Sequence, residues 1–157
     1  MSDIADAFDA HGGFEATDAG YAATANDWTA TVRLDGGEVV VTVRVPTLSA
    51  AVRVEEEVAD VVEDGWFETF ELRVADAPNV TRAEAVAVPT VERADGEVVV
   101  TVRLAARGGN AASDALAVVN YVEGTWFEGI VPGYDYREDV QDLRDRAAGR
   151  AQATDSI

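Results

Sequence analysis

The chain of 157 residues contains no cysteine and no lysine, and it has a single histidine. The absence of cysteine excludes disulfides and thiolate metal sites. A histidine-based metal site or catalytic triad needs partners of a kind that this chain lacks. His11 stands just before Gly12-Gly13 at a predicted helix C-terminus, where a partial positive charge is favourable, so we expect it to cap that helix. We predict no catalytic residue, no metal ligand and no cofactor.

Basic residues are also scarce. Twelve arginines face thirty acidic residues, which gives a net charge of −18. In dilute buffer such a charge destabilises the compact state, whereas at molar salt the Debye length falls to roughly 3 Å and the repulsion largely disappears. We interpret the chain as adapted to a salt-rich cytoplasm. A mimic of the nucleic-acid backbone or an acidic calcium binder would explain the acids but not the missing lysine.

Long apolar runs are missing as well, so no transmembrane segment is predicted. Residues 1–6 carry acids where a signal peptide needs a basic segment, and we expect a cytoplasmic protein that binds neither membrane nor nucleic acid. Phosphate-loop, dinucleotide and EF-hand spacings are absent. The acidic run Glu55-Glu56-Glu57 is predicted to form the solvated face of a helix, because consecutive helical residues point in different directions.

What the chain does contain is an internal repeat. The segment GEVVVTVR occurs at residues 37–44 and again 59 residues later at 96–103. Downstream, VEDGWFE at 62–68 is matched by VEGTWFE at 122–128. Two collinear matches with nearly one offset indicate an internal duplication. We predict one domain over residues 1–157, with repeats at about 28–76 and 85–130 and a C-terminal helical tail at 137–150.

Hydrophobic alternation with period two predicts a hairpin in each repeat. The first spans residues 28–45 with its turn at Asp35-Gly36-Gly37, and the second spans 85–104 with its turn at Asp95-Gly96. A further strand at residues 21–24 would lie at an edge. With helices at the N-terminus and after each hairpin, the simplest fold is α+β: an antiparallel sheet of about five strands with helices on one face.

The helical period after the first hairpin predicts a long helix. Thr47 or Ser49 caps it, and it runs past Gly65 until Ala77-Pro78 stops it. A strand from Trp66 to Val74 is the alternative.

The helix of the second repeat has a similar pattern. Asn110 or Ser113 caps it, and we expect it to continue through Trp126 and Phe127 until Pro132-Gly133. Large aromatic residues at matching positions of two repeats are usually core anchors. A ligand cleft or dimer surface shared by Trp66 and Trp126 is the other interpretation.

The segment from Gly129 to Tyr136 is too apolar for an ordinary loop. Ile130 and Tyr134 flank a turn at Pro132-Gly133, and Asp135 stands between two tyrosines. Packing of this loop onto the core explains the composition, and an exposed aromatic contact surface also explains it. The candidate binding residues are therefore Ile130, Tyr134, Asp135 and Tyr136, together with Trp66 and Trp126.

Three segments carry a resemblance to a known family. They are VVVTVRVPTL at residues 39–48, GWFETFE at 65–71, and VEG at 122–124 with EGIVPGYDY at 128–136. The sequence resembles small acidic haloarchaeal proteins grouped as a domain of unknown function. This resemblance implies a haloarchaeal origin and no assigned activity.

These observations favour a protein-interaction or chaperone-like module without catalytic activity, whose partner is an unknown protein or a second copy of the chain. The alternative is a small-molecule binder or enzyme with a site between the two repeats. A deep pocket lined by arginine and carboxylates would favour the alternative, and a flat apolar patch would favour the module.

Overall fold

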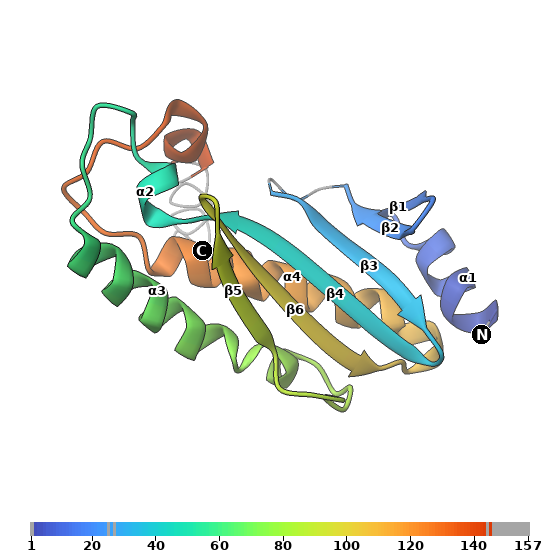
Figure 1. Ribbon diagram of the computed structural model, residues 1–157. Helices are drawn as coiled ribbons and strands as arrows, with labels where there is room; N and C mark the ends of the chain where they lie inside the picture. Colours follow the sequence, from blue (N-terminus) through green and yellow to red (C-terminus); the bar gives the residue numbers. More distant parts are fainter. Residues whose placement is uncertain (1, 25, 27, 144, 146–157) are drawn as a thin grey trace, which may run out of the picture.

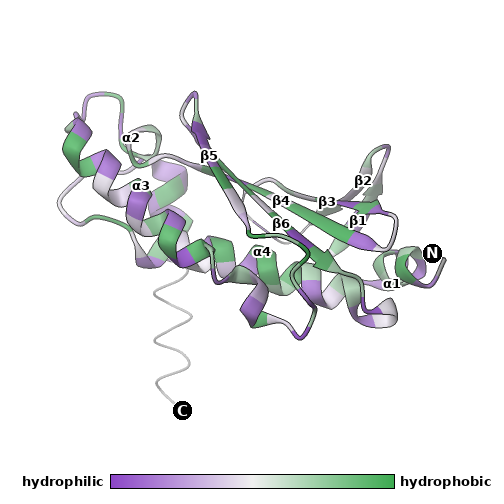
Figure 2. Cartoon of the chain, turned by 60° about the horizontal axis from the view of Figure 1, so that its bottom comes forward, coloured by the Kyte–Doolittle hydropathy of each residue, from purple (hydrophilic) through white to green (hydrophobic). Residues whose placement is uncertain are grey.

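The computed structural model of the chain describes residues 2–24, 26, 28–143 and 145. Its centre is a six-stranded antiparallel sheet in the order β1-β2-β3-β4-β6-β5, with α1, α3 and α4 on one side of it (Figures 1 and 2). The fold is α+β, as predicted, with six strands instead of about five. The elements are α1 Ser2–Ala10, β1 Phe14–Thr17, β2 Gly20–Ala23, β3 Ala30–Asp35, β4 Glu38–Pro46, α2 Leu48–Ala51, α3 Asp60–Val74, η1 Ala77–Val80, β5 Thr90–Ala94, β6 Glu97–Ala105, η2 Gly108–Asn110 and α4 Ala111–Glu128.

Both predicted hairpins form, and their turns have similar backbone geometry. Gly36-Gly37 joins β3 to β4 with φ angles of 56° and 92°, and Asp95-Gly96 joins β5 to β6 with φ angles of 51° and 81°. Two successive residues with positive φ are typical of type I′ turns, whose twist suits antiparallel strands. The second hairpin starts later than predicted, at Thr90, while Ala85 forms an isolated bridge with Leu104.

The two strands that carry the repeated GEVVVTVR segment lie side by side at the centre of the sheet. β4 pairs with β6, and Thr42 lies directly opposite Thr101, its counterpart in the other copy. Two ion pairs between these strands also correspond under the repeat: Arg44–Glu97 at 3.2 Å and Arg103–Glu38 at 3.5 Å. The pairing of β4 with β6 is therefore symmetric about the point between the two threonines.

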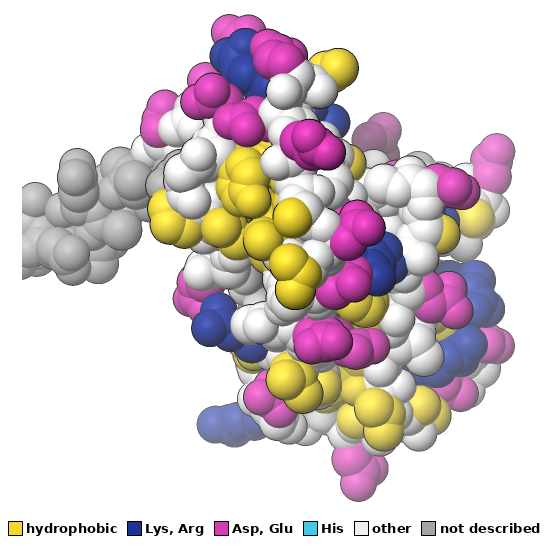
Figure 3. Space-filling model, turned by 60° about the vertical axis from the view of Figure 1, so that its left-hand side comes forward, with side chains coloured by type: hydrophobic (Ala, Val, Ile, Leu, Met, Phe, Trp, Pro, Cys, Tyr) yellow, Lys and Arg dark blue, Asp and Glu magenta, His cyan; other side chains and the backbone are white. Residues whose placement is uncertain are grey.

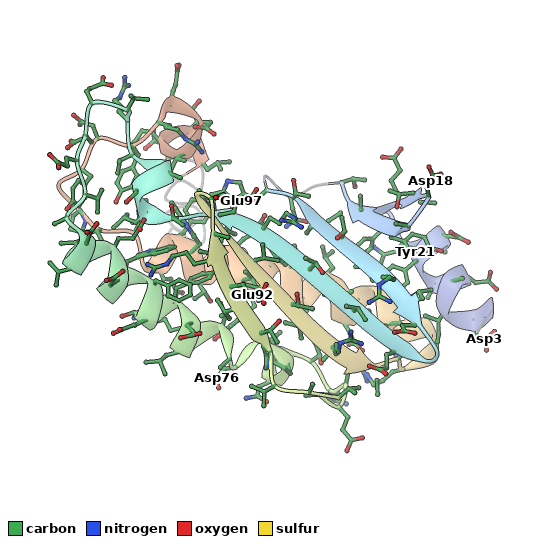
Figure 4. All side chains as sticks on the ribbon, in the orientation of Figure 1. Asp3, Asp18, Tyr21, Asp76, Glu92 and Glu97 are labelled. Carbon is green, nitrogen blue, oxygen red and sulfur yellow. The ribbon has the colours of Figure 1, made fainter. Side chains whose placement is uncertain are left out.

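The face of the sheet that is turned toward the helices forms the core. Alternate residues of β4 and β6 point to it and are each at most 1% exposed: Val39, Val41, Val43, Val45, Val98, Val100, Val102 and Leu104. Burying one such side chain contributes about 1.5–3 kcal/mol. The opposite face carries a row of threonines across four strands, namely Thr31, Thr42, Thr101 and Thr90. Acidic side chains such as Asp3, Asp18 and Asp76 lie at the periphery (Figure 4).

The N-terminal part contains a strand that the sequence analysis did not predict. β1 pairs with β2, so β2 lies inside the sheet and not at its edge. Gly20 starts β2 with a φ of 152°, and a Cβ there would lie 2.1 Å from the Val32 carbonyl oxygen, so only glycine fits. Tyr21 stacks on Phe8, and its hydroxyl donates to Asp9 Oδ1 at 3.0 Å.

The long helix predicted from Thr47 or Ser49 is wrong over its first half. Thr47 does cap a helix, because its Oγ1 accepts a hydrogen bond from the Ala50 N–H at 3.2 Å. That helix is α2, however, and it ends at Ala51. α3 begins only at Asp60, and from there it is helical through Trp66 to Val74, so the alternative of a strand is wrong.

Contacts with a distant part of the chain explain the break at residues 52–59. Val52 forms a β-bridge with Tyr136, and the Arg53 N–H donates to the Asp135 carbonyl oxygen at 2.8 Å. These backbone groups would hydrogen-bond within the helix if it continued. Nothing in the local periodicity indicates this long-range pairing.

The break also changes the position of the residues between the two helices. Val54, which falls within the predicted helix, is 99% exposed. Glu55-Glu56-Glu57 lie in a non-helical segment, and not on the face of a helix. Glu56 Oε1 accepts a hydrogen bond from the Asp135 N–H at 2.9 Å, so part of this acidic run holds the loop that follows α4.

The remaining predicted ends differ by a few residues. His11 lies directly after α1, where its Nδ1 accepts a hydrogen bond from the Gly13 N–H at 3.0 Å. α4 ends at Glu128, before Pro132-Gly133. The predicted tail at 137–150 is helical at residues 138–143 and 145. Residue 144 and residues 146–157 lie outside the described residues. Within the described chain, no helix is long and apolar enough to cross a membrane.

Candidate functional site

A cavity of about 360 Å³ opens between α3 and α4, one helix from each predicted repeat. Its walls are Gly65, Trp66, Thr69, Phe70, Arg73, Thr125, Glu128, Gly129 and Val131. The set combines aromatic rings, one arginine, one carboxylate and two glycines. The arginine and the carboxylate are two of the features expected of a small-molecule site between the repeats.

The aromatic floor of the cavity comes from the periodicity of α3. Trp66, Phe70 and Val74 follow one another at intervals of four residues and are the buried residues of this helix. The rings of Trp66 and Phe70 are nearly parallel, with centroids 5.5 Å apart and 10° between their planes. Both side chains line the cavity but are almost fully buried, with 5% of Trp66 and 3% of Phe70 exposed, so they add a small aromatic area to its wall.

Trp126 supports this floor from the core. It is fully buried, and its ring centroid lies 6.4 Å from that of Trp66. Its Nε1–H donates to the Pro46 carbonyl oxygen at 2.9 Å, which fixes α4 to the end of β4. Trp28 also packs against Trp126, and the two ring centroids are 4.8 Å apart. The structure thus brings both predicted tryptophans together, but only Trp66 lines the cavity.

Polar groups form the rim of the cavity. Arg73 and Glu128 are both exposed and lie near the C-terminal ends of α3 and α4. The Thr125 hydroxyl donates to the Tyr121 carbonyl oxygen at 2.7 Å. The Tyr121 hydroxyl donates to the Arg73 carbonyl oxygen at 2.9 Å and so ties the two helices together beside the cavity.

Gly65 is the most informative wall residue. It lies within α3, where glycine costs roughly 0.5–1 kcal/mol relative to alanine. Its φ is not positive, and no heavy atom lies within 4 Å of the position that a Cβ would take. Neither the backbone nor close packing therefore requires glycine, while a side chain here would narrow the cavity. Gly124 in α4 is equally uncrowded but does not line the cavity, so it offers a matched control.

The loop predicted as a binding surface packs onto the protein instead of standing free. Tyr136 is 2% exposed, and its hydroxyl donates to the Val131 carbonyl oxygen. Ile130, Val131 and Tyr134 are half-buried against the core, while Asp135 is exposed. Of these residues only Val131 reaches the cavity. A binding role for Ile130, Tyr134, Asp135 and Tyr136 remains a prediction, and their arrangement matches the alternative in which the loop covers the core.

The uncovered face of the sheet carries a second hollow, of about 380 Å³. Thr31, Thr42 and Thr101 line it together with Arg33 and Arg103. Both arginines already contact Asp35, at 3.4 and 3.9 Å, and Arg103 also contacts Glu38. Because carboxylates balance their charge, this hollow offers weaker recognition than the cavity between the helices.

In the described part of the chain, no group of three or more histidine, aspartate or glutamate side chains converges as a metal site would require. Burial, followed by the hydrogen bond from Tyr21 to Asp9, raises the pKa of the Tyr21 hydroxyl above its ordinary value. Tyr21 lies under α1, away from the cavity, so this shift belongs to the core.

The chain belongs to a family of unknown function (DUF5813), whose model matches residues 9–146. No curated protein and no solved structure matches the chain. This match confirms the resemblance to a family of unknown function at that level. Because the family has no assigned activity, the cavity is the feature from which a function is inferred.

Proposed function

We propose that this protein is a binding protein, and that the cavity between α3 and α4 holds a small molecule with an apolar or aromatic body. The observation that carries the proposal is a cavity of about 360 Å³ with the stacked rings of Trp66 and Phe70 as its floor. Ligand sites commonly enclose about 300–1,000 Å³ and are lined mainly by apolar and aromatic groups. The cavity lies at the lower end of that range, which fits a ligand of metabolite size.

The energetics support an apolar ligand body. Apolar atoms of Trp66 and Phe70 line the cavity, so an apolar ligand group that displaces water from beside them gains free energy. Each buried methylene of the ligand then contributes about 0.8 kcal/mol. Gly65 adds a cost of roughly 0.5–1 kcal/mol to α3 and keeps the wall free of a side chain.

The proposal is tested with phenylnaphthylamine, a neutral dye that fluoresces when bound in apolar sites. Titration in about 2 M potassium chloride, where charge repulsion is screened, should give saturable binding. Gly65→Leu should weaken it tenfold or more by filling the cavity, whereas Gly124→Leu should leave it unchanged. Circular dichroism confirms that both variants are folded. Equal binding by the two variants would contradict the proposal.

We further infer that the two repeats arose by duplication of one hairpin-and-helix unit. The equal offsets in sequence, the opposition of Thr42 and Thr101, and the correspondence of the two ion pairs across β4 and β6 support this inference. The cavity between α3 and α4 then lies at the junction of the two units. An experimental structure in which β3, β4 and α3 do not superpose on β5, β6 and α4 would contradict the inference.

The composition supports a proposal about where the protein works. A net charge of −18 without any lysine fits a cytoplasm with molar salt, and with the resemblance noted above it fits a haloarchaeal origin. We propose that the protein is halophilic and cytoplasmic. The dependence of its stability on salt, treated in the Discussion, tests this.

A second candidate function is protein interaction, which one observation favours. Large apolar side chains are strongly exposed: Val54 at 99%, Val88 at 80%, Val61 at 78% and Leu72 at 75%. Figure 3 shows hydrophobic side chains gathered among acidic ones on the side of the molecule where α2 and α3 lie. Sedimentation at high salt measures self-association, and a monomer at all concentrations would rule out pairing with a second copy.

A further inference from the structure

We propose that the ligand of the cavity is an organic anion, and that Arg73 binds its carboxylate or an equivalent acidic group. This inference rests on the proposed function, because it names the chemistry of the molecule that the cavity holds. It concerns a small molecule with an apolar body and one anionic end. The inference is based on the charged residues of the rim, because the aromatic floor alone does not show whether the ligand carries a charge.

Most arginine side chains in the described part of the chain have a carboxylate partner. Within the described residues, six arginines make ion pairs: Arg33, Arg44, Arg93, Arg103, Arg107 and Arg137. Arg53, Arg73 and Arg82 make none there, although acids far outnumber arginines. Of these three, Arg73 lines the cavity. A guanidinium that is left without an anion beside an apolar cavity is suited to supply two parallel N–H donors to a ligand carboxylate.

The position of Arg73 is fixed by its neighbours. The Tyr121 hydroxyl donates to the Arg73 carbonyl oxygen at 2.9 Å, which holds the last turn of α3 against α4. A position near a helix C-terminus also favours a cation through the helix dipole. That effect explains the presence of an arginine in this turn, but not its place in the wall of a cavity.

The backbones of Glu128 and Arg73 lie at different places along the cavity. A Cβ on Gly129 would lie 3.8 Å from Trp66 Nε1, so the end of α4 with Glu128 lies near Trp66. Arg73 lies seven residues further along α3. At a rise of about 1.5 Å per residue, the backbone of Arg73 lies roughly 10 Å along α3 from that of Trp66, beside which α4 ends. A ligand therefore meets a positive end at Arg73 and an aromatic middle at Trp66 and Phe70.

The charge of −18 does not prevent an anion from binding at high salt. With a Debye length of roughly 3 Å at 1 M salt, the distant carboxylates are screened, while a direct contact with Arg73 persists. The probes are anilinonaphthalene sulfonate and phenylnaphthylamine, because the two dyes share their rings and differ in the sulfonate. The variant is Arg73→Gln. Its control is Arg82→Gln, which removes the same charge from an exposed residue that does not line the cavity.

Both dyes should bind the wild type, and Gly65→Leu should weaken both. Arg73→Gln should weaken binding of the sulfonate dye about tenfold or more and change binding of the neutral dye less than about twofold. Arg82→Gln should change neither by more than about twofold. If Arg73→Gln acts like Arg82→Gln, or weakens both dyes equally, the anion is refuted and the binding cavity stands. If neither dye binds, or Gly65→Leu has no effect, both the cavity function and this inference are refuted.

Discussion

Replacing Trp126 by Phe tests whether the two tryptophans at matching repeat positions have different energetic roles. Both are nearly inaccessible to solvent, at 0% for Trp126 and 5% for Trp66. Of the two, only Trp126 donates a hydrogen bond from Nε1 within the described chain, and its acceptor is the Pro46 carbonyl oxygen. Phe retains much of the ring but removes this donor and part of the ring volume.

The expected loss of stability follows from these two changes. A buried acceptor left without its partner costs about 1–3 kcal/mol. The missing part of the indole leaves a space beside Trp28 and Trp66 and adds about 1–2 kcal/mol, since complete removal of such a side chain costs about 3–5 kcal/mol. We expect about 3 kcal/mol for Trp126→Phe. Trp66 borders an existing cavity, and Trp66→Phe removes no hydrogen bond within the described residues. This change should lower the free energy of unfolding by about 1 kcal/mol.

Urea unfolding followed by circular dichroism at high salt measures both values without relying on tryptophan fluorescence. Thermal unfolding provides a second estimate, because about 1 kcal/mol corresponds to roughly 2–4 °C in a chain of this size. Trp126→Phe should therefore lower the melting temperature by about 6–12 °C. Equal losses for the two variants would refute the reasoning, because they would mean that the hydrogen bond to Pro46 adds nothing.

Two further predictions concern solution conditions. With a net charge of −18, the protein should unfold cooperatively at molar potassium chloride and lose much of its stability near 0.1 M, where the Debye length is about 10 Å. A melting temperature that does not change with salt would contradict the halophilic interpretation. Because burial and Asp9 raise the pKa of Tyr21 above 10.0, the stabilisation by its neutral hydroxyl should be complete below about pH 10 and lost as the pH rises through the folded-state pKa. Between about pH 8 and 11, the melting temperature should therefore fall less steeply with pH for Tyr21→Phe than for the wild type. An equal fall for both proteins would exclude this contribution.

The parts of the fold that could be predicted depend on local patterns. The alternation around Asp35-Gly36-Gly37 and Asp95-Gly96 predicted both hairpins, because a buried face and a type I′ turn are each encoded within a few residues. The four-residue spacing of Trp66, Phe70 and Val74 predicted α3 in the same way. These elements bury the side chains that their own periodicity places on one face.

The parts that could not be predicted depend on distant partners. The helix is interrupted at residues 52–59 because that segment pairs with the loop around Asp135 and Tyr136, far along the chain. β1 was missed because only four residues, of which Phe14 alone is buried, form it against β2. The cavity combines residues from α3 and the end of α4, whose proximity local patterns do not reveal. Of the predicted binding residues, only Trp66 lies in its wall.

The symmetric pairing of β4 with β6 has a consequence for how the molecule is made. Synthesis delivers β4 before β6, and in that interval one edge of β4 has unpaired backbone groups. A β4 strand from another nascent chain offers the same register, with threonine opposite threonine and the same two ion pairs. Only the covalent link to β6, which raises its effective concentration to about the millimolar range, favours closure within one chain. Strand exchange between molecules is therefore most favoured where ribosomes translate one messenger RNA close together.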